Sequence, residues 1–473
     1  MHYSFFSRTR LVRVLALIGL LILSGCSTVR PWQNRAAQPG TIRTQESALQ
    51  ATIPPPSIVV VVALSGGGSR AAAFGLGVLQ EMNATHFSWE GKPTNLLERL
   101  SAISGVSGGS VLAAYYAAFG AEGLNEFEAD FLLKDIQGDF ISQAISSATA
   151  YRLTSPWFGR SNAFAEQLDK LYKGKTYGDV AGRKGAPELL IAATDLTTGA
   201  PFEFSPEQFR LICSDLSSVP LAFAVASSSA IPFVLTPTSL RNQAAGCAAP
   251  ALPIVEATQS DAHNASTSYR RQLLDRSAAS YLNAEERPFI HLVDGGLADN
   301  LGVRILLDRV VASGSIQNRF RESPPGSVRK IVLIVVNSER DMVDRIDQSD
   351  KVPSTAQVID ALVFGAGSRS TQETMAALND GVSGWADKIA QSRGERNSPF
   401  SADAEIHVIP VSLHDVDDRD VRRLLLQVPT AFTIEPRQVS QLVESGRSTL
   451  RTSPAFQRLV KDLQQKSCAE QCN

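Results

Sequence analysis

The sequence is poor in the residue types that build metal sites. Its 473 residues include only six histidines and five cysteines, with no CxxC pair and no histidine cluster. Structural and catalytic metal sites draw on closely spaced ligands of these types, so we expect no metal. The 45 Lys+Arg are matched by 47 Asp+Glu, and no basic stripe is present. This charge balance gives no support for a nucleic-acid partner.

The N-terminal region has no apolar run long enough to anchor the chain. The run from Leu15 to Leu23 is too short for a stable membrane span. It follows three arginines and precedes small residues, an order typical of secretory signals, so we predict a signal peptide over residues 1–25. The tetrapeptide Leu23-Ser24-Gly25-Cys26 resembles a bacterial lipobox, which implies cleavage before Cys26 and its acylation. Three acyl chains exceed what stable anchoring needs. A plain signal peptide with an incidental cysteine is the alternative.

The residues after the lipobox bear on the location of the protein. An Asp after Cys26 would resemble an inner-membrane retention signal, and Ser27 stands there instead. This favours the outer membrane of a bacterial envelope, with the domain facing the periplasm. Residues 26–57 are polar and end in three prolines, which is typical of a flexible tether. Such a tether would hold the domain off the bilayer.

Four cysteines remain once the lipobox cysteine is acylated. An even number in an oxidising compartment predicts two disulfides, Cys213–Cys247 and Cys468–Cys472. Free buried thiols are the alternative, because cysteine is among the most buried residue types.

The order of apolar segments predicts the fold class. Residues 58–64 (IVVVVAL) form an uninterrupted run typical of a strand buried on both faces of a parallel sheet. Further strands are predicted at 100–103, 189–193, 289–293, 331–336 and 406–411, and helices at 70–82 and 108–119. This alternation predicts an α/β fold with a mainly parallel central sheet flanked by helices. Residues 58–473 are expected to form one domain, with a helical insert at 124–175, a surface excursion at 241–287 and helices over 413–466.

Ser107 is the candidate nucleophile. Gly105-Val106-Ser107-Gly108-Gly109 matches the G-x-S-x-G pattern of a nucleophile elbow, and it lies between a predicted strand and a predicted helix. The flanking glycines permit the sharp turn that exposes the serine oxygen. The following helix N-terminus favours negative charge that develops there.

Two further motifs also follow strands. Ser65-Gly66-Gly67-Gly68-Ser69-Arg70 offers backbone N–H groups to an anion, as a phosphate cradle or an oxyanion hole. No Walker lysine and no G-x-G-x-x-G is present, which argues against a nucleotide. Arg70 either contacts a lipid phosphate or anchors the loop. We favour the anchor, because a charge in the first helical turn tends to pair locally. A purely structural glycine turn is the alternative.

Asp294 is the candidate base. It precedes Gly295 and Gly296 and ends the predicted strand FIHLV, so we expect it at the C-terminal edge of the parallel sheet, where α/β folds place their sites. An ordinary Asp-Gly turn is the alternative.

In combination, SGGGSR, GVSGG and DGGLADN resemble the patatin-like phospholipase family. Residues 224–232 (AVASSSAIP) are similar to that family's A-S-x-x-x-P segment. The resemblance covers residues 58–305 and leaves 306–473 less diagnostic. It implies a three-layer core in which Ser107 is the nucleophile, Asp294 its general base and Gly66, Gly67 and Gly68 the oxyanion hole. It also implies hydrolysis of membrane-lipid acyl esters through an acyl-enzyme, without metal, nucleotide or other cofactor.

A Ser-His-Asp triad on an α/β-hydrolase fold is a competing hypothesis. That fold places its histidine after the acid, and only His407 and His414 follow Asp294. His407 lies in an apolar strand and is expected in the core, while His414 borders an acidic stretch and is expected in solvent. His291 lies three residues before Asp294 on one strand, so it should face away.

A non-catalytic envelope lipoprotein that binds lipid belongs to a different class. Its serine, aspartate and glycine loop would then be idle. Loss of any one of these groups costs orders of magnitude in rate. The presence of all three therefore favours an enzyme.

Overall fold

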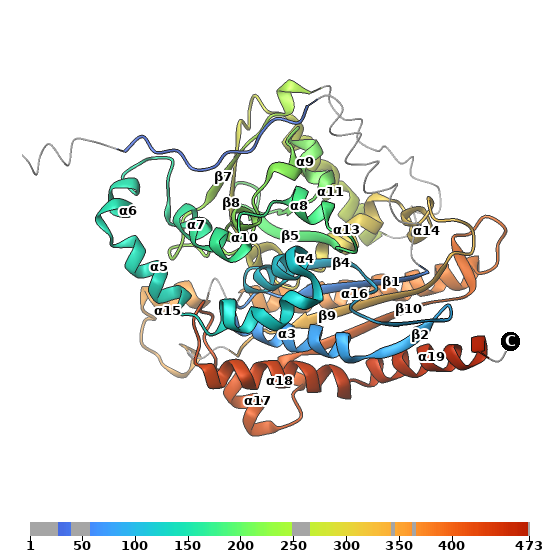
Figure 1. Ribbon diagram of the computed structural model, residues 1–473. Coiled ribbons are helices and arrows are strands. Elements are labelled where there is room, and N and C mark those ends of the chain that lie inside the picture. Colours follow the sequence, from blue (N-terminus) through green and yellow to red (C-terminus); the bar gives the residue numbers. More distant parts are fainter. Residues whose placement is uncertain (1–26, 39–56, 248–264, 342–345, 362–365, 472–473) are drawn as a thin grey trace, which may run out of the picture.

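One eight-stranded sheet crosses the middle of the molecule (Figure 1). The computed structural model describes residues 27–38, 57–247, 265–341, 346–361 and 366–471. The strands lie in the order β10 (Phe400–Ser412), β9 (Val328–Asn337), β1 (Ile58–Leu64), β4 (Leu100–Val106), β5 (Glu188–Asp195), β8 (Phe289–Asp294) and β7 (Thr238–Arg241), and β6 (Pro201–Phe204) pairs with β5. Neighbours from β10 to β5 run parallel. All six strands predicted from the sequence are present, which confirms the mainly parallel α/β sheet.

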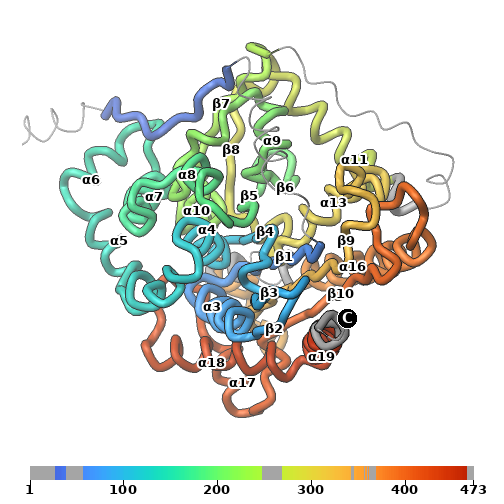
Figure 2. The backbone as a smooth tube through the Cα atoms, turned by 45° about the vertical axis from the view of Figure 1, so that its right-hand side comes forward, coloured from blue at the N-terminus to red at the C-terminus, as the bar shows by residue number. Residues whose placement is uncertain are grey.

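Helices cover both faces of this sheet and complete three layers (Figure 2). On β1, Val60 and Val62 belong to the large core shared with α3 (Gly68–Ala84), α4 (Gly108–Phe127) and α18 (Pro436–Thr452). Ala63 points the other way, into a second core with α13 (Arg304–Ala312) and α16 (Ala366–Ser392). Successive side chains of a strand alternate between faces, so a run without polar residues is buried on both.

The direction of β8 differs from the expectation. Asp294 was expected at the end of a parallel strand, but β8 runs antiparallel to β5, and β7 runs antiparallel to β8. β8 and β5 overlap only where both strands end, with Ala193 paired to Asp294 and Asp195 paired to Leu292. Because the two C-terminal ends overlap, Asp294 still reaches the edge of the sheet where β1 and β4 end.

The predicted helical regions are helical. The insert contains a π-helix (Glu128–Leu132), α5 (Ile136–Ala144), α6 (Ser147–Arg152) and α7 (Arg160–Tyr172), and the C-terminal part contains α17 (Arg419–Leu425), α18 and α19 (Pro454–Gln471). The remaining α-helices are α8 (Tyr177–Gly182), α9 (Pro206–Leu211), α10 (Leu221–Ser228), α11 (Ala265–Leu282), α12 (Gly296–Asp299), α14 (Ile316–Arg319) and α15 (Thr355–Asp360). A short hairpin of β2 (His86–Trp89) and β3 (Lys92–Asn95) stands apart from the main sheet. The sequence did not predict this hairpin, β6 or β7, because each of their strands has only four residues.

Residues 27–38 lie against the domain, which contradicts the expected free tether for this stretch. The Trp32 ring packs against Phe223 with 4.6 Å between centroids. Asn34 is buried, and its amide donates to Ser214 Oγ at 2.7 Å. Ser27, also buried, donates its backbone N–H to Thr154 Oγ1 at 3.0 Å. These side chains find partners that a polar composition does not reveal. Residues 39–56 lie outside the described ranges.

Two further predictions concern covalent links and the membrane. Cys213 and Cys247 form the predicted disulfide, with their Cα atoms 6.1 Å apart. The predicted Cys468–Cys472 pair and Cys26 lie outside the described side chains. Within the described ranges, no helix has both the length and the hydropathy required to span a bilayer.

Candidate active site

Ser107 sits at a sharp turn between β4 and α4. Its backbone has φ 49° and ψ −121°, a combination that costs a non-glycine residue conformational energy. The turn is held by the Ser107 N–H, which donates to Ser228 Oγ at 2.8 Å, while Ser228 Oγ donates to the carbonyl of Ala192 at 2.6 Å. Ser107 is 3% exposed. This is the geometry of a nucleophile elbow, at the N-terminus of a 20-residue helix.

The glycine loop lies directly against this elbow. A Cβ on Gly108 would come within 2.0 Å of the carbonyl oxygen of Gly68. Gly67 and Gly68 adopt φ values of 140° and 62°, which L side chains rarely tolerate. Two motifs about 40 residues apart in the chain, the glycine loop and G-x-S-x-G, therefore meet through backbone contact, as the parallel pairing of β1 and β4 requires.

The glycine loop has fewer N–H groups available to an oxyanion than the three expected from the sequence. The Gly66 N–H already donates to the carbonyl oxygen of Asn300 at 2.9 Å, so it is not available to a substrate, and the expectation is wrong for Gly66. The N–H groups of Gly67 and Gly68 make no hydrogen bond to any described residue. Gly67 lines the cavity beside Ser107. The loop thus leaves two donors, with Gly67 nearest the site.

Asp294 enters the site from the end of β8. It is 7% exposed, and its Oδ1 accepts the Gly296 N–H at 2.8 Å. Burial raises the pKa of Asp294 to about 6, against the opposing effects of the Gly296 N–H and the Ser107 hydroxyl. Its Oδ2 accepts no hydrogen bond of normal geometry from the described residues. The Ser107 hydroxyl lies close enough to lower the pKa of Asp294 but makes no hydrogen bond of normal geometry to Oδ2, and such catalytic contacts often tighten when substrate binds.

The serine-rich segment at 224–232 fixes the position of both groups. Ser228 Oγ holds the Ser107 backbone, as described above. The carbonyls of Ser228 and Ala230 accept the N–H groups of Gly295 and Asp294 at 3.1 and 3.0 Å. One segment thereby ties the nucleophile elbow to the end of β8. The sequence showed this segment only through its family resemblance.

Arg70 is buried and faces three acceptors of the protein itself. Nε donates to the Ser338 carbonyl at 2.8 Å, Nη1 to the Val428 carbonyl at 2.5 Å and Nη2 to Thr430 Oγ1 at 3.3 Å. Burial and, to a smaller extent, nearby Arg340 lower the pKa of Arg70 to about 9, against the opposing effect of Glu339, so the side chain stays charged at neutral pH. These contacts join the start of α3 to the residue after β9 and to the segment before α18, and Arg70 also lines the cavity beside Ser107.

A small cavity of about 60 Å³ opens onto these residues. Its lining includes six positions that sequence reasoning did not single out: Ile231, Leu297, Asn300, Glu339, Arg340 and Thr430. Asn300 stood in the DGGLADN motif without an assigned role, and its Oδ1 would lie 2.5 Å from a Cβ on Gly66. Glu339, Arg340 and Thr430 come from the C-terminal region, where no motif marked them. The volume is far below the roughly 300–1,000 Å³ of a pocket for a drug-sized ligand.

No histidine lines this cavity. His291 is exposed, and its Nδ1 lies 2.8 Å from Ser239 Oγ. His414 Nε2 lies 3.8 Å from Asp341 at the surface. His407 projects from β10, on the far side of β9 and β1 from β4. The described site therefore offers a serine and a carboxylate but no imidazole.

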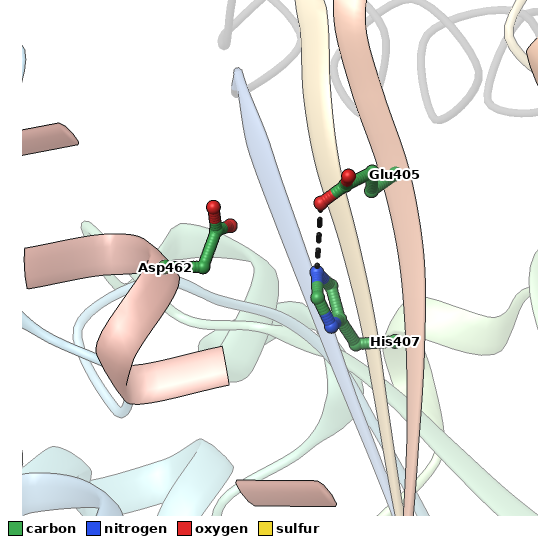
Figure 3. Close-up of side chains that lie close together, drawn as sticks. All are labelled: Glu405, His407 and Asp462. Carbon is green, nitrogen blue, oxygen red and sulfur yellow. Dashed lines mark ion pairs between the residues drawn. The ribbon is translucent and has the colours of Figure 1, made fainter. Parts of the chain in front are cut away.

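One group of side chains has the spacing of metal ligands. Glu405, His407 and Asp462 have ligand atoms within 4.8 Å of one another, and Figure 3 shows His407 directed at Glu405 with Asp462 on the neighbouring helix. The Lys330 ammonium lies 2.5 Å from both Glu405 and Asp462. A cationic side chain thus already lies between the two carboxylates and offsets one of their two negative charges. This group fits an ion-pair network better than a metal site.

The family follows from comparison with known proteins. The profile of the patatin-like phospholipase family matches residues 62–307, the region that holds the glycine loop, Ser107 and Asp294. The chain belongs to this family, whose members hydrolyse lipid acyl esters, and this membership supports lipid acyl hydrolase activity. No curated protein matched the chain by sequence.

Solved structures of human GIVD cytosolic phospholipase A2 are similar to the chain at 11% identity. The structure described without an inhibitor has a TM-score of 0.45, with 94% of this chain and 69% of that chain covered. The complex with methyl gamma-linolenyl fluorophosphonate has a TM-score of 0.42, with 91% and 63% covered. The complex that also contains terbium chloride has a TM-score of 0.41, with 94% and 67% covered.

Proposed function

We propose that this protein is a membrane-tethered serine hydrolase that cleaves acyl esters of phospholipids through a Ser107–Asp294 dyad. The observation that supports this most strongly is the meeting of three groups in one cavity. A nucleophile elbow, a buried carboxylate with a raised pKa and a glycine loop whose Gly67 N–H is free of hydrogen bonds to the described residues all converge there. Each has a distinct task in acyl transfer.

In the first half-reaction, Ser107 Oγ attacks the ester carbonyl carbon and Asp294 accepts the hydroxyl proton. The carbonyl oxygen becomes an oxyanion, which the Gly67 and Gly68 N–H groups stabilise as donors. The bond to the alcohol then breaks, and the proton on Asp294 passes to the leaving alkoxide. The products are an acylated Ser107 and a free lipid alcohol.

In the second half-reaction, water attacks the acyl-Ser107 carbonyl. Asp294 takes one proton from this water as the new bond forms, and the same glycine N–H groups bind the oxyanion. The bond to Ser107 Oγ then breaks, and Asp294 returns the proton to that oxygen. A fatty acid leaves and the free enzyme is restored.

The electrostatics of Asp294 suit a general base. A base is most effective when its pKa lies near the working pH, and burial brings the pKa of Asp294 to about 6. Arg340 also lines the cavity, and we propose that its guanidinium contacts a lipid phosphate. We expect Arg340→Ala to lower turnover of a phospholipid more than turnover of a neutral acyl ester. Equal losses on both substrates would argue against a phosphate contact.

Covalent labelling tests the nucleophile. A fluorophosphonate probe should phosphonylate Ser107 of the active protein, and peptide mapping should locate the adduct there. Ser107→Ala should abolish both labelling and turnover of a chromogenic acyl ester. The neighbouring Ser110→Ala is the matched control, and it should keep labelling. Labelling that disappears when a histidine is replaced would refute the dyad. A Ser107→Ala protein that still hydrolyses the ester would also refute it.

The membrane tether is tested separately. We propose that Cys26 carries the acyl chains and that the protein resides in the bacterial outer membrane. Mass spectrometry of the mature N-terminus should find an acylated Cys26. Membrane fractionation should place the protein in the outer membrane. An unmodified mature N-terminus after residue 25 would favour the plain signal peptide.

A further inference from the structure

The docked N-terminal segment determines where the lipid anchor leaves the domain. Ser27 is buried and bonded to Thr154, and the Ser155 hydroxyl donates to the Val29 carbonyl at 2.7 Å. The Arg30 guanidinium lies 3.9 Å from the centre of the Trp157 ring. Cys26 precedes Ser27 by one peptide bond. An anchor on the residue before Ser27 would therefore begin one peptide bond from the Ser27–Thr154 contact in the loop after α6, not at the end of a long free tether.

Large apolar side chains are exposed on the same part of the molecule. They are Ile141 of α5, Ile145 at the C-terminal end of α5, Tyr151 of α6, Trp157, and Phe233 and Val234 of the loop before β7. We term these six residues the docking face. Ile141 and Ile145 are four residues apart and share one side of the helix. Phe233 is 73% exposed and has φ +70°, which is strained for a bulky residue. Exposure combined with strain indicates a functional constraint rather than packing.

The docking face adjoins the active-site cavity. The Arg160 guanidinium donates to the Phe233 carbonyl at 2.9 Å, and Ile231, two residues earlier, lines the cavity. On the other side, the Gln137 N–H of α5 donates to Thr433 Oγ1 at 2.9 Å, three residues from the cavity-lining Thr430. The helical insert thus lies between the anchor site and the cavity, and Figures 1 and 2 both show α5 and α6 at one edge of the molecule, next to the start of the described chain.

The charges around this face favour apolar insertion over attraction to anionic lipid. Arg152 is paired with Glu166, and Lys134 lies 3.7 Å from Asp130. Acidic residues thus accompany two of the basic ones, while Arg30 stacks on Trp157 and Arg160 donates to the Phe233 carbonyl. A surface that bound through anionic headgroups would carry an unpaired basic cluster. Exposed Trp, Tyr and Phe are the side chains that favour the boundary between headgroups and acyl chains.

We propose that the docking face inserts into the lipid surface to which Cys26 is anchored, so that the active-site cavity opens directly onto the membrane. This inference rests on the proposed acyl hydrolase function and its tether. The cavity of about 60 Å³ has no room for a whole acyl chain. A lipid would then present its ester to Ser107 while its chains remain in the bilayer or lie along the docking face.

Tryptophan quenching tests insertion without relying on catalysis. The acylated full chain carrying Ser107→Ala is reconstituted into phosphatidylcholine vesicles with brominated acyl chains, and its emission is compared with that in unbrominated vesicles. Brominated chains should quench part of the emission, and Trp157→Phe should remove that part. Trp385→Phe is the matched control, because Trp385 packs among the second-core residues of α16, and it should leave the quenched part unchanged. Adding phosphatidylglycerol should change quenching little.

Two results would overturn the proposal. One is equal emission in brominated and plain vesicles. The other is quenching that survives Trp157→Phe. If the face instead binds a second copy of the chain, quenching will be absent and Ile145→Arg will convert a dimer to a monomer.

A second measurement links the docking face to turnover. Phe233→Ser combined with Val234→Ser should lower hydrolysis of vesicle phospholipid by on the order of tenfold, because two apolar side chains no longer insert. Hydrolysis of a soluble ester should not change. Tyr269→Ser with Leu273→Ser, exposed apolar positions on α11, should affect neither substrate. Equal vesicle turnover in both double variants would contradict the docking face. Absence of ester turnover in every protein would contradict the proposed function alone.

Discussion

Asp294 and Lys330 are buried ionisable residues of the same sheet, and their surroundings differ. Lys330 is flanked by Asp462 and Glu405. Burial acts to lower the pKa of Lys330, but hydrogen bonds to these two carboxylates outweigh it and raise the pKa. Asp294 has no comparable partner: burial raises its pKa to about 6, and no cationic side chain among the described residues counters this. The Lys330 ammonium is paired with neighbouring carboxylates, whereas the Asp294 carboxylate has no such cationic partner and can accept a proton.

This difference separates an ion-pair cluster from the carboxylate that we propose as the general base. A folded-state pKa of about 6, above the ordinary 3.8, means that Asp294 favours the folded state less as the pH rises from 4 to 6. At neutral pH the ionised carboxylate therefore costs about 3 kcal/mol of stability. The Lys330 cluster has no such unpaired charge. A buried ionisable group that costs stability and has no partner of opposite charge is a good candidate for function.

Removing the dyad should have the largest effect. Ser107→Ala and Asp294→Asn should each lower kcat for a soluble ester by roughly 10³-fold or more, and the double variant should be little worse, because the two groups act as a unit. Asp294→Asn should also raise Tm at pH 7, since it removes the unpaired charge. His407→Ala and His414→Ala should keep most activity. A histidine variant as inactive as Ser107→Ala would restore the triad hypothesis.

Disturbing the glycine loop should have the next largest effect. Gly67→Ala places a Cβ at φ 140° and 2.8 Å from Arg70 Nη2, so the loop must shift. We expect kcat to fall by on the order of 10²-fold with KM little changed, because the N–H groups act on the developing oxyanion. Binding of a non-hydrolysable lipid and the melting transition serve as controls. Weakened lipid binding with kcat preserved would show that the loop holds a phosphate instead.

Breaking the Lys330 cluster should affect stability and not chemistry. Lys330→Met keeps the apolar stem but leaves Glu405 and Asp462 without their shared cation. The free energy of unfolding should fall by about 2 kcal/mol, less than for a fully buried pair because both carboxylates are partly exposed. Urea unfolding measures this change. Ester hydrolysis below the melting transition should stay at the wild-type level, and a loss of kcat would mean that the cluster reaches the active site.

The pH dependence should show the smallest effect. Asp294 must be deprotonated to accept the Ser107 proton, and its pKa is about 6, so activity should rise as the pH passes through 6. At pH 5 the rate should be about tenfold below the plateau above pH 7. Rates on a soluble ester across pH 4.5–8, with melting followed at each pH, test this. A midpoint near 4 would mean that Asp294 is not the base.

Much of the site could be predicted from sequence because its motifs are local. Ser107 lies between two glycines, and Asp294 ends a strand that the apolar pattern marks. Gly66 could not be excluded as a donor, because the acceptor of its N–H is the Asn300 carbonyl, far away in the chain. Thr430 and Arg340 could not be found either, since each lies in a segment without a motif and reaches the cavity only through folding.

The packing of residues 27–38 against the domain also could not be predicted from the sequence. The polar composition of this segment predicted a free tether. Composition is an average over all positions, so it does not show which individual side chains can pack against the domain. Trp32 and Asn34 are two residues of that stretch, and each finds a specific partner on the domain. Whether a polar segment packs depends on whether such partners exist, which only the folded surface decides.

By itself the sequence determined the strand and helix order and the family, and it marked Ser107 and Asp294 as the candidate nucleophile and base. These depend on apolar periodicity and short motifs, which are properties of neighbouring residues. Tertiary structure decided that β8 runs antiparallel, that burial raises the pKa of Asp294, and that residues 27–38 pack against the domain with Ser27 bonded to Thr154. Strand direction, burial and docking all depend on contacts between residues distant in the chain, and no local pattern encodes them.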